Sequence, residues 1–230
     1  MIEEPPLLTI RRPDRRPTDA EIAAFQGVPS SFVADAMFGT GAMLGIRPFG
    51  DGRDFPCVAS GPALTVDNMP GGILALVACT PFIRPGDIVV NAFAGYQGVA
   101  AAGDRITGMM KNAGAAGFVT DGPMRDHPGV VAVGLPCWCS GLNPASPVST
   151  GPGRVGLPVK IGGLEVETGD MIVADRDGVV VVPFERIGEV LAQLERVREL
   201  EEALDAEVAK GLKWGAAIGE LLESDRVRYV

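Results

Sequence analysis

The stretch that decides the fold reads Gly114-Ala-Ala-Gly-Phe-Val-Thr-Asp121-Gly122-Pro-Met-Arg125-Asp126. Its apolar run, 117–120, predicts a buried strand, and Asp121-Gly122 predicts a turn off the strand end. Rigid scaffolds hold reactive groups on the loops that follow such strand ends. There the carboxylate of Asp126 can hold a hard metal ion, and the guanidinium of Arg125 can bind a carboxylate or enolate oxygen. The same spacing is equally typical of a surface turn pair.

Short apolar segments alternate with helical patterns around this stretch. A capping box of Thr18 and Glu21 predicts a helix to about Phe25. The other expected elements are a helix over 30–38, a broken strand over 57–67, a helix over 71–79, a strand over 88–91, a helix over 98–113, a strand over 130–135, a long loop over 140–156, a hairpin of 159–161 with 164–166, strands over 171–174 and 179–182, and a helical region over 185–222 broken at Gly211. This order predicts an α/β fold with mixed rather than purely parallel pairing.

The chain has 230 residues, which suits one large domain or two small ones, and we expect one. Residues 1–17 are rich in proline and arginine and predict an irregular N-terminal arm. Residues 18–184 form the expected α/β core. Residues 185–230 form a charged helical extension, which we expect to pack on a neighbouring subunit, although its own domain is an equal possibility.

The composition narrows the classes of function. The formal net charge is −9 and the pI is about 4.7, whereas a nucleic-acid-binding protein normally carries a basic face. The basic cluster of Arg11, Arg12, Arg15 and Arg16 is expected to be a solvated arm. No run approaches the roughly 18 apolar residues of a spanning helix, and no charged-then-apolar leader opens the sequence. We therefore expect a cytoplasmic protein that binds neither nucleic acid nor membranes.

The cysteines, the histidine and one aspartate leave alternatives open. Cys57, Cys79, Cys137 and Cys139 are expected to be reduced structural thiols, with a redox role of the last two as the alternative. His127 follows Asp126 and is either a general base or part of a solvent-facing turn. Asp121 is expected to cap the turn that presents Arg125. The alternative is that its carboxylate hydrogen-bonds to groups that bind the metal.

An ordered set of motifs carries a resemblance to a known family. The motifs are Gly27-Val-Pro29, Asp35-Ala36, Gly45-Ile-Arg-Pro48, Gly61-Pro-Ala-Leu-Thr-Val66, Pro85-Gly-Asp-Ile-Val-Val90, Ala100-Ala-Ala-Gly-Asp104, the stretch that ends at Asp126, Gly151-Pro-Gly153, Gly169-Asp170 and the segment 175–183. With them the chain resembles the RraA-like family, which includes class II 4-hydroxy-4-methyl-2-oxoglutarate aldolases and related oxaloacetate decarboxylases. The resemblance covers roughly residues 20–210, and the motifs are more specific for the family than for the reaction.

The resemblance implies a fold, an assembly and a site. The fold would be an α-β-β-α sandwich of the swivelling β/β/α type with mixed sheets, assembled as homotrimers or hexamers with sites between subunits. Asp126 would hold Mg²⁺ or Mn²⁺, and Arg125 would contact a small 2-oxo-acid substrate. The loop before the middle helix would bind the pyruvoyl carboxylate, with Gly95, Tyr96, Gln97 and Gly98 as its substrate-binding residues. A carboxylate of the neighbouring subunit would complete the site.

The resemblance implies a lyase that cleaves a 4-hydroxy-2-oxo acid or decarboxylates oxaloacetate through a pyruvate enolate. A divalent metal serves such a reaction as Lewis acid, and no Schiff-base lysine is required. One departure stands out, because Ala94 and Tyr96 replace a glycine and an aspartate that family aldolases often carry. That departure keeps a second hypothesis open, a non-catalytic regulatory protein of the ribonuclease-regulator type.

Overall fold

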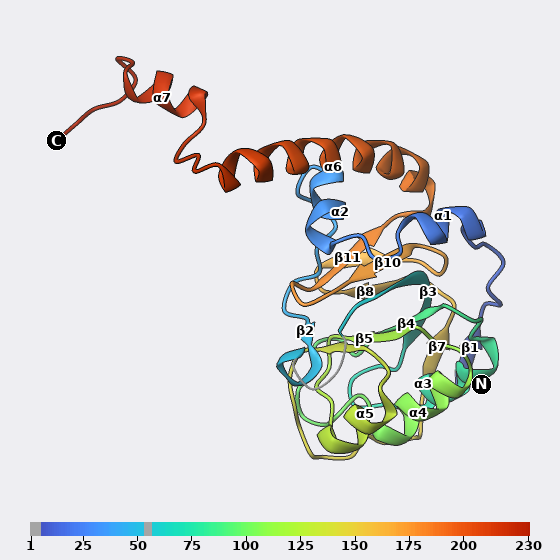
Figure 1. The fold of residues 1–230 in the computed structure, drawn as a ribbon. Coiled ribbons are helices and arrows are strands. Elements are labelled where there is room, and N and C mark those ends of the chain that lie inside the picture. The colour runs from blue at the N-terminus through green and yellow to red at the C-terminus, as the bar shows by residue number, and fades with distance from the viewer. Residues whose placement is uncertain (1–5, 53–56) are drawn as a thin grey trace, which may run out of the picture.

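The computed structural model describes residues 6–52 and 57–230, and its centre is a mixed β-sheet (Figure 1). The described strands are β1 Leu8–Ile10, β2 Arg47–Pro48, β3 Ala59–Asp67, β4 Ile88–Ala92, β5 Gly117–Thr120, β6 Cys137–Cys139, β7 Gly153–Val155, β8 Val159–Ile161, β9 Leu164–Val166, β10 Met171–Ala174 and β11 Val179–Val182. The sheet runs β1-β7-β3-β4-β5-β6-β2, with β10 and β11 continuing from the other end of β3. Strands β3 to β6 are parallel to one another. Strand β7 is antiparallel to β3 but parallel to β1, and β2 and β10 pair antiparallel with β6 and β3.

The layers follow from side chains that alternate between faces. The described helices are α1 Asp19–Ala24, α2 Ser30–Ala36, α3 Leu74–Ala78, α4 Asp104–Asn112, α5 His127–Val133, α6 Ile187–Ala209 and α7 Ala216–Leu222. Val89 and Phe118 of the parallel strands pack against the α3–α5 layer, whereas Val90 packs against the β8–β9 and β10–β11 hairpins. The opposite face of β10–β11 buries Val173 and Val180 against α1, α2 and α6. The expected α-β-β-α sandwich is therefore confirmed (Figure 1).

Strand β3 is continuous where the sequence predicts a broken strand. Its first half, up to Pro62, pairs with β10, and its second half, from Ala63, pairs with β4. Proline has no backbone N–H, so it is tolerated at the point where the strand changes partner. Gly61 lies against the carbonyl oxygen of Gly86, and a Cβ there would overlap that oxygen. Both apparent breaks are local adaptations of one strand.

The segment 130–135 was predicted as a strand, and that prediction is wrong. Helix α5 covers most of it, with Pro128 in the first turn and Gly134 ending the helix at φ 69°. Val130 is buried against the sheet, because tertiary packing overrides the β-propensity of a valine-rich run. The middle helix also differs, since α4 begins at Asp104 rather than near Gly98. The predicted long loop, 140–156, ends in strand β7.

Over the described residues 6–17 the N-terminal arm is irregular apart from β1, as expected, but part of it is bound to the core rather than solvated. Strand β1 pairs in parallel with β7. The guanidinium of Arg15 reaches Glu167 at 2.9 Å and Glu185 at 2.7 Å. Arg16 pairs with the buried carboxylate of Asp87. Two members of the basic cluster, Arg15 and Arg16, thus pair with acidic groups of the same chain, whereas Arg11 and Arg12 are exposed.

The C-terminal extension is divided between a packed part and a projecting part. Ile187, Val190 and Leu194 of α6 are buried against the α1–α2 layer. The rest of α6 and all of α7 project away from the domain, and Leu200 and Leu204 are exposed (Figure 1). No described helix is long and apolar enough to cross a membrane.

Candidate functional site

The carboxyl ends of β3, β4 and β5 are joined by a buried polar ladder. The Asn68 side chain donates to Asn91 at 2.6 Å, and Asn91 donates to the hydroxyl of Thr120 at 3.1 Å. The backbone N–H of Gly122 donates to the same hydroxyl at 3.2 Å. All three side chains are at most 2% exposed. A satisfied buried network of this kind holds the loops that leave the strand ends in one arrangement.

Asp121 continues the ladder into the next loop. Its carboxylate accepts the backbone N–H groups of Phe93 at 2.6 Å and Gly95 at 2.8 Å. Burial raises the pKa of this carboxyl, and the two backbone donors oppose that rise. The carboxylate of Asp121 therefore caps the loop after β4, and not the turn that presents Arg125 as the sequence predicted.

Asp126 is presented differently. It has φ 59° and ψ 44°, a left-handed conformation that non-glycine residues adopt at a cost of about 1–3 kcal/mol. Its side chain is 41% exposed. It lines a cavity of about 480 Å³ together with Arg125, Gly103 at the start of α4, and residues of helix α3. A strained residue that turns its carboxylate into a cavity is typical of a functional site.

Arg125 lies beside Asp126 on the same cavity. Its Nε is 3.2 Å from the Asp126 carboxylate, and a terminal nitrogen of its guanidinium donates to the hydroxyl of Ser146. Its backbone N–H donates to the carbonyl of Ala102 at 3.0 Å. Gly103 closes the contact, because a Cβ at that position would overlap the Asp126 carboxylate. The Arg-Asp pair is thus fitted onto the segment that leads into α4.

The N-terminus of α4 forms another part of the cavity wall. Gly103 caps this helix in an extended conformation and offers no side-chain oxygen to its first N–H groups. Asp104 and Arg105 of the first turn line the cavity. An uncapped helix start presents backbone N–H groups and a positive dipole end, both of which favour a bound anion.

The predicted substrate-binding loop, Gly95, Tyr96, Gln97 and Gly98, does not line this cavity. Tyr96 is 43% exposed and packs on Phe93, with ring centroids 6.1 Å apart. Gln97 accepts from Ser140 at 2.9 Å, and its carbonyl accepts from Asn143 at 2.7 Å. These bonds brace the loop that carries Ser146, the partner of Arg125. In the isolated chain the 95–98 loop therefore supports the site from behind, and its direct contact with substrate stays a prediction.

The donor set suits a hard divalent ion. Asp126 and, on the helix side, Asp104 are the carboxylates that line the cavity. Mg²⁺ is commonly held by one or two protein carboxylates with water and substrate oxygens as its other ligands. The described residues contain no cluster of three or more His, Cys, Asp or Glu side chains placed to hold a metal. The oxygen-only set fits Mg²⁺ or Mn²⁺ better than a soft-ligand metal.

Two other candidates lie apart from the cavity. The His127 ring stacks on Phe49, with centroids 5.0 Å apart, and packs over Gly50. The four cysteines are buried and free, and burial raises the pKa of each thiol, to about 11 for Cys57 and Cys139. Such thiols are inert at neutral pH, so the structure favours the structural interpretation of the cysteines.

Sequence reasoning missed the Asn68–Asn91–Thr120 ladder, the Ser146 contact and the presence of Arg105 in the cavity. Asn91 gave the one usable signal, because it is an amide inside the apolar strand Ile88–Ala92. A buried amide requires partners, and strand ends are where polar side chains converge. Ser146 and Arg105 carry no comparable signal in a single sequence.

Comparison with known proteins bears on the family and the fold. A model of the RraA-like family, described as Aldolase/RraA, matches residues 30–181. A Halalkalibacterium halodurans protein named "Putative 4-hydroxy-4-methyl-2-oxoglutarate aldolase" is 33% identical over 82% of this chain and 88% of its own. Streptomyces coelicolor RraAS2, described as an unusual member of the RNase ES inhibitor RraA protein family, has a TM-score of 0.74 and 28% identity, covering 84% of this chain and 99% of that one. An uncharacterized Pseudomonas syringae protein with a TM-score of 0.74 and 23% identity, covering 87% and 97%, supports the fold alone.

Proposed function

The chain belongs to the RraA-like family, and from that premise we propose that it is a divalent-metal-dependent carbon–carbon lyase. Its substrate would be a 4-hydroxy-2-oxo acid of the 4-hydroxy-4-methyl-2-oxoglutarate type, oxaloacetate, or both. The observation that carries the proposal is the cavity itself. Arg125, Asp126 and the uncapped start of α4 line one space of about 480 Å³.

Each wall of the cavity supplies one requirement of the reaction. A bound divalent ion would act as a Lewis acid on a 2-oxo acid, and Asp126 is the carboxylate that would hold it. The first-turn N–H groups of α4 would bind the substrate carboxylate. Arg125, fixed by Ser146, would stabilise the negative charge that develops on the oxo oxygen as the carbon–carbon bond breaks. Among the described residues that line the cavity there is no lysine for a Schiff base.

We also propose that the working form is a homotrimer or hexamer. The cavity is open, and among the described residues that line it Asp126 and Asp104 are the only carboxylates. The projecting half of α6 carries exposed leucines together with several glutamates. A neighbouring subunit's extension could in this way bring an additional carboxylate to the site.

The test is pyruvate release from oxaloacetate and from 4-hydroxy-4-methyl-2-oxoglutarate with Mg²⁺, Mn²⁺ or EDTA. Turnover should require the metal and should be lost in the Asp126→Ala variant. Asp177→Ala, in the exposed turn between β10 and β11, is the matched control and should retain full activity. Turnover that persists in EDTA, or in Asp126→Ala, would contradict the proposal.

The likeness to RraAS2 favours a second candidate function, inhibition of a ribonuclease. RraAS2 shares 28% identity over most of the chain, and its description links its family to RNase ES inhibition. A regulator of this kind would bind RNase ES equally well with and without EDTA, and its binding would be unaffected by Asp126→Ala. The retained Arg125–Asp126 pair and its strained backbone favour the lyase.

A further inference from the structure

Arg105 is a second arginine on the wall of the cavity. It is the second residue of α4, it is exposed, and it lines the same space as Arg125. Within the described part of the chain, no carboxylate lies within ion-pair distance of its guanidinium. The two arginines are the only cationic side chains among the described lining residues.

The two arginines differ in how many contacts their guanidinium groups already make. Arg125 already contacts Asp126 and Ser146, so its guanidinium is positioned beside the expected metal ligand. Arg105 retains its full set of donors. A guanidinium binds a carboxylate through two parallel hydrogen bonds, an arrangement that a lysine cannot reproduce.

The apolar part of the cavity wall explains why Arg105 matters for the choice of substrate. Ile73, at the start of α3, Val77 of α3 and Met109 of α4 line the same space as Arg105. Met109 lies four residues after Arg105, so both side chains share one face of α4. These apolar side chains offer nothing to a second charged group on a substrate, whereas they can contact a methyl group or an aliphatic carbon.

We propose that Arg105 is a specificity-determining residue that binds the far carboxylate of a dicarboxylic substrate. The inference rests on the proposed function, in which the Arg125–Asp126 end of the cavity holds the 2-oxo-acid head. A substrate that carries a carboxylate at each end would then engage both arginines. A monocarboxylic 2-oxo acid would leave Arg105 unused and should bind more weakly.

The test compares two unreactive ligands with the same 2-hydroxycarboxylate head, malate and lactate. Calorimetry in the presence of Mg²⁺ should show that the wild-type protein binds malate more tightly than lactate. Arg105→Gln should weaken malate binding by about tenfold and leave lactate binding unchanged, since one partly solvated charged contact is removed. Arg105→Lys should recover only part of the preference.

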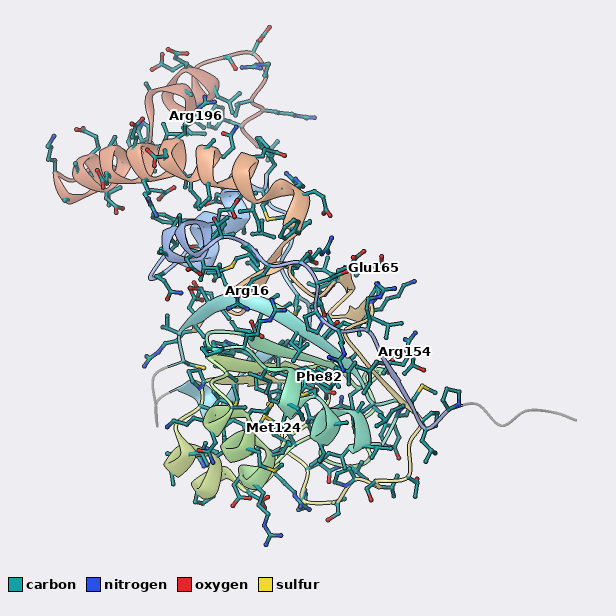
Figure 2. The ribbon with its side chains drawn as sticks, turned by 90° about the vertical axis from the view of Figure 1, so that its right-hand side faces the viewer. Arg16, Phe82, Met124, Arg154, Glu165 and Arg196 are labelled. Atoms are coloured by element: carbon teal, nitrogen blue, oxygen red, sulfur yellow. The ribbon has the colours of Figure 1, made fainter. Side chains whose placement is uncertain are left out.

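The control is Arg196→Gln, on α6. Arg196 and Met124, the neighbour of Arg125, lie at opposite ends of the molecule (Figure 2). This variant should bind both acids as the wild type does. Equal loss of malate and lactate binding in Arg105→Gln, or no loss at all, would overturn the proposed role of Arg105.

The same variants separate this inference from the lyase proposal. With a dicarboxylic substrate, Arg105→Gln should raise KM with little change in kcat, because the contact is made equally in ground and transition states. If the wild-type protein releases pyruvate but binds malate no better than lactate, the lyase proposal stands and the proposed role of Arg105 is wrong. If the protein prefers malate through Arg105 but releases no pyruvate, the role of Arg105 stands and the lyase proposal is wrong.

Discussion

Two neighbouring segments, the strand end 117–122 and the loop 123–127, differ in how their polar groups are used. In the first, Thr120 accepts from Asn91 of β4 and from the backbone of Gly122, and Asp121 accepts from the backbone of the loop after β4. In the second, Asp126 is exposed in a left-handed conformation, and within the described part of the chain its carboxylate pairs with the adjacent Arg125. The first segment is held rigid by internal hydrogen bonds, whereas the second keeps a carboxylate accessible to an external ligand.

The difference separates two kinds of aspartate that look alike in sequence. Asp121 contributes by fixing the loop after β4, so its removal should affect stability. Asp126 contributes little to the fold and keeps its carboxylate available, so its removal should affect function. Variants in the two segments should therefore fall into two classes with little overlap.

Among variants that keep the expected metal ligand, the largest effect is on catalysis and comes from Arg125→Gln. Loss of a charged donor aimed at developing negative charge should lower kcat/KM for oxaloacetate on the order of 10²–10³-fold. The unfolding free energy should change by no more than about 0.5 kcal/mol, since the guanidinium is at the surface of the cavity. Steady-state kinetics and urea unfolding measure the two quantities. An Arg125→Gln protein with normal turnover but a clearly lower unfolding free energy would contradict the assignment of the 123–127 loop to function.

Asn91→Ala should give the opposite result. It leaves the buried Asn68 amide and the Thr120 hydroxyl without their shared partner, and each unsatisfied group costs about 1–3 kcal/mol. We expect the unfolding free energy to fall by about 3 kcal/mol in urea titrations. Asn112→Ala, at the last turn of α4 and exposed, is the control that should change little. An Asn91→Ala protein as stable as the control would mean that the ladder does not hold the strand ends.

The sequence predicted the strand segment better than the loop. Strand 117–120 and the hairpin of β8 and β9 have the expected bounds, because apolar runs and turn residues are local signals. Helix α5 was mistaken for a strand, since its valines reveal their helical register only once Val130 packs under the sheet. The ladder joins residues of three strands, and no local pattern encodes such a meeting.

Asp121 should also make stability depend on pH. Its pKa is raised by burial, so the folded state binds the proton more tightly than the unfolded chain. Its contribution to the unfolding free energy is complete below the unfolded pKa of about 4 and is lost as the pH rises through the folded value. Asp121→Asn should lack this component. Urea unfolding of both proteins from pH 3 to pH 7 measures it, and parallel curves would contradict the assignment.

Thiol reagents are expected to have the smallest effect on the activity of the native protein. Burial raises the pKa of Cys79 to about 12 and holds the pKa of Cys137 well above its usual value. Iodoacetamide at pH 7.5 should leave the native protein unmodified and active, and it should label all four cysteines in urea. Mass spectrometry counts the adducts. Rapid native labelling of Cys137 or Cys139 would restore the redox alternative.

Direct metal binding tests the central claim, that Asp126 is the ligand and Asp121 the support. Mn²⁺ should bind the wild-type protein in calorimetry, and the binding heat should vanish in Asp126→Ala. Asp121→Asn, studied at a temperature where it is folded, should bind Mn²⁺ with nearly the wild-type affinity. Wild-type affinity in Asp126→Ala together with lost binding in Asp121→Asn would contradict the account.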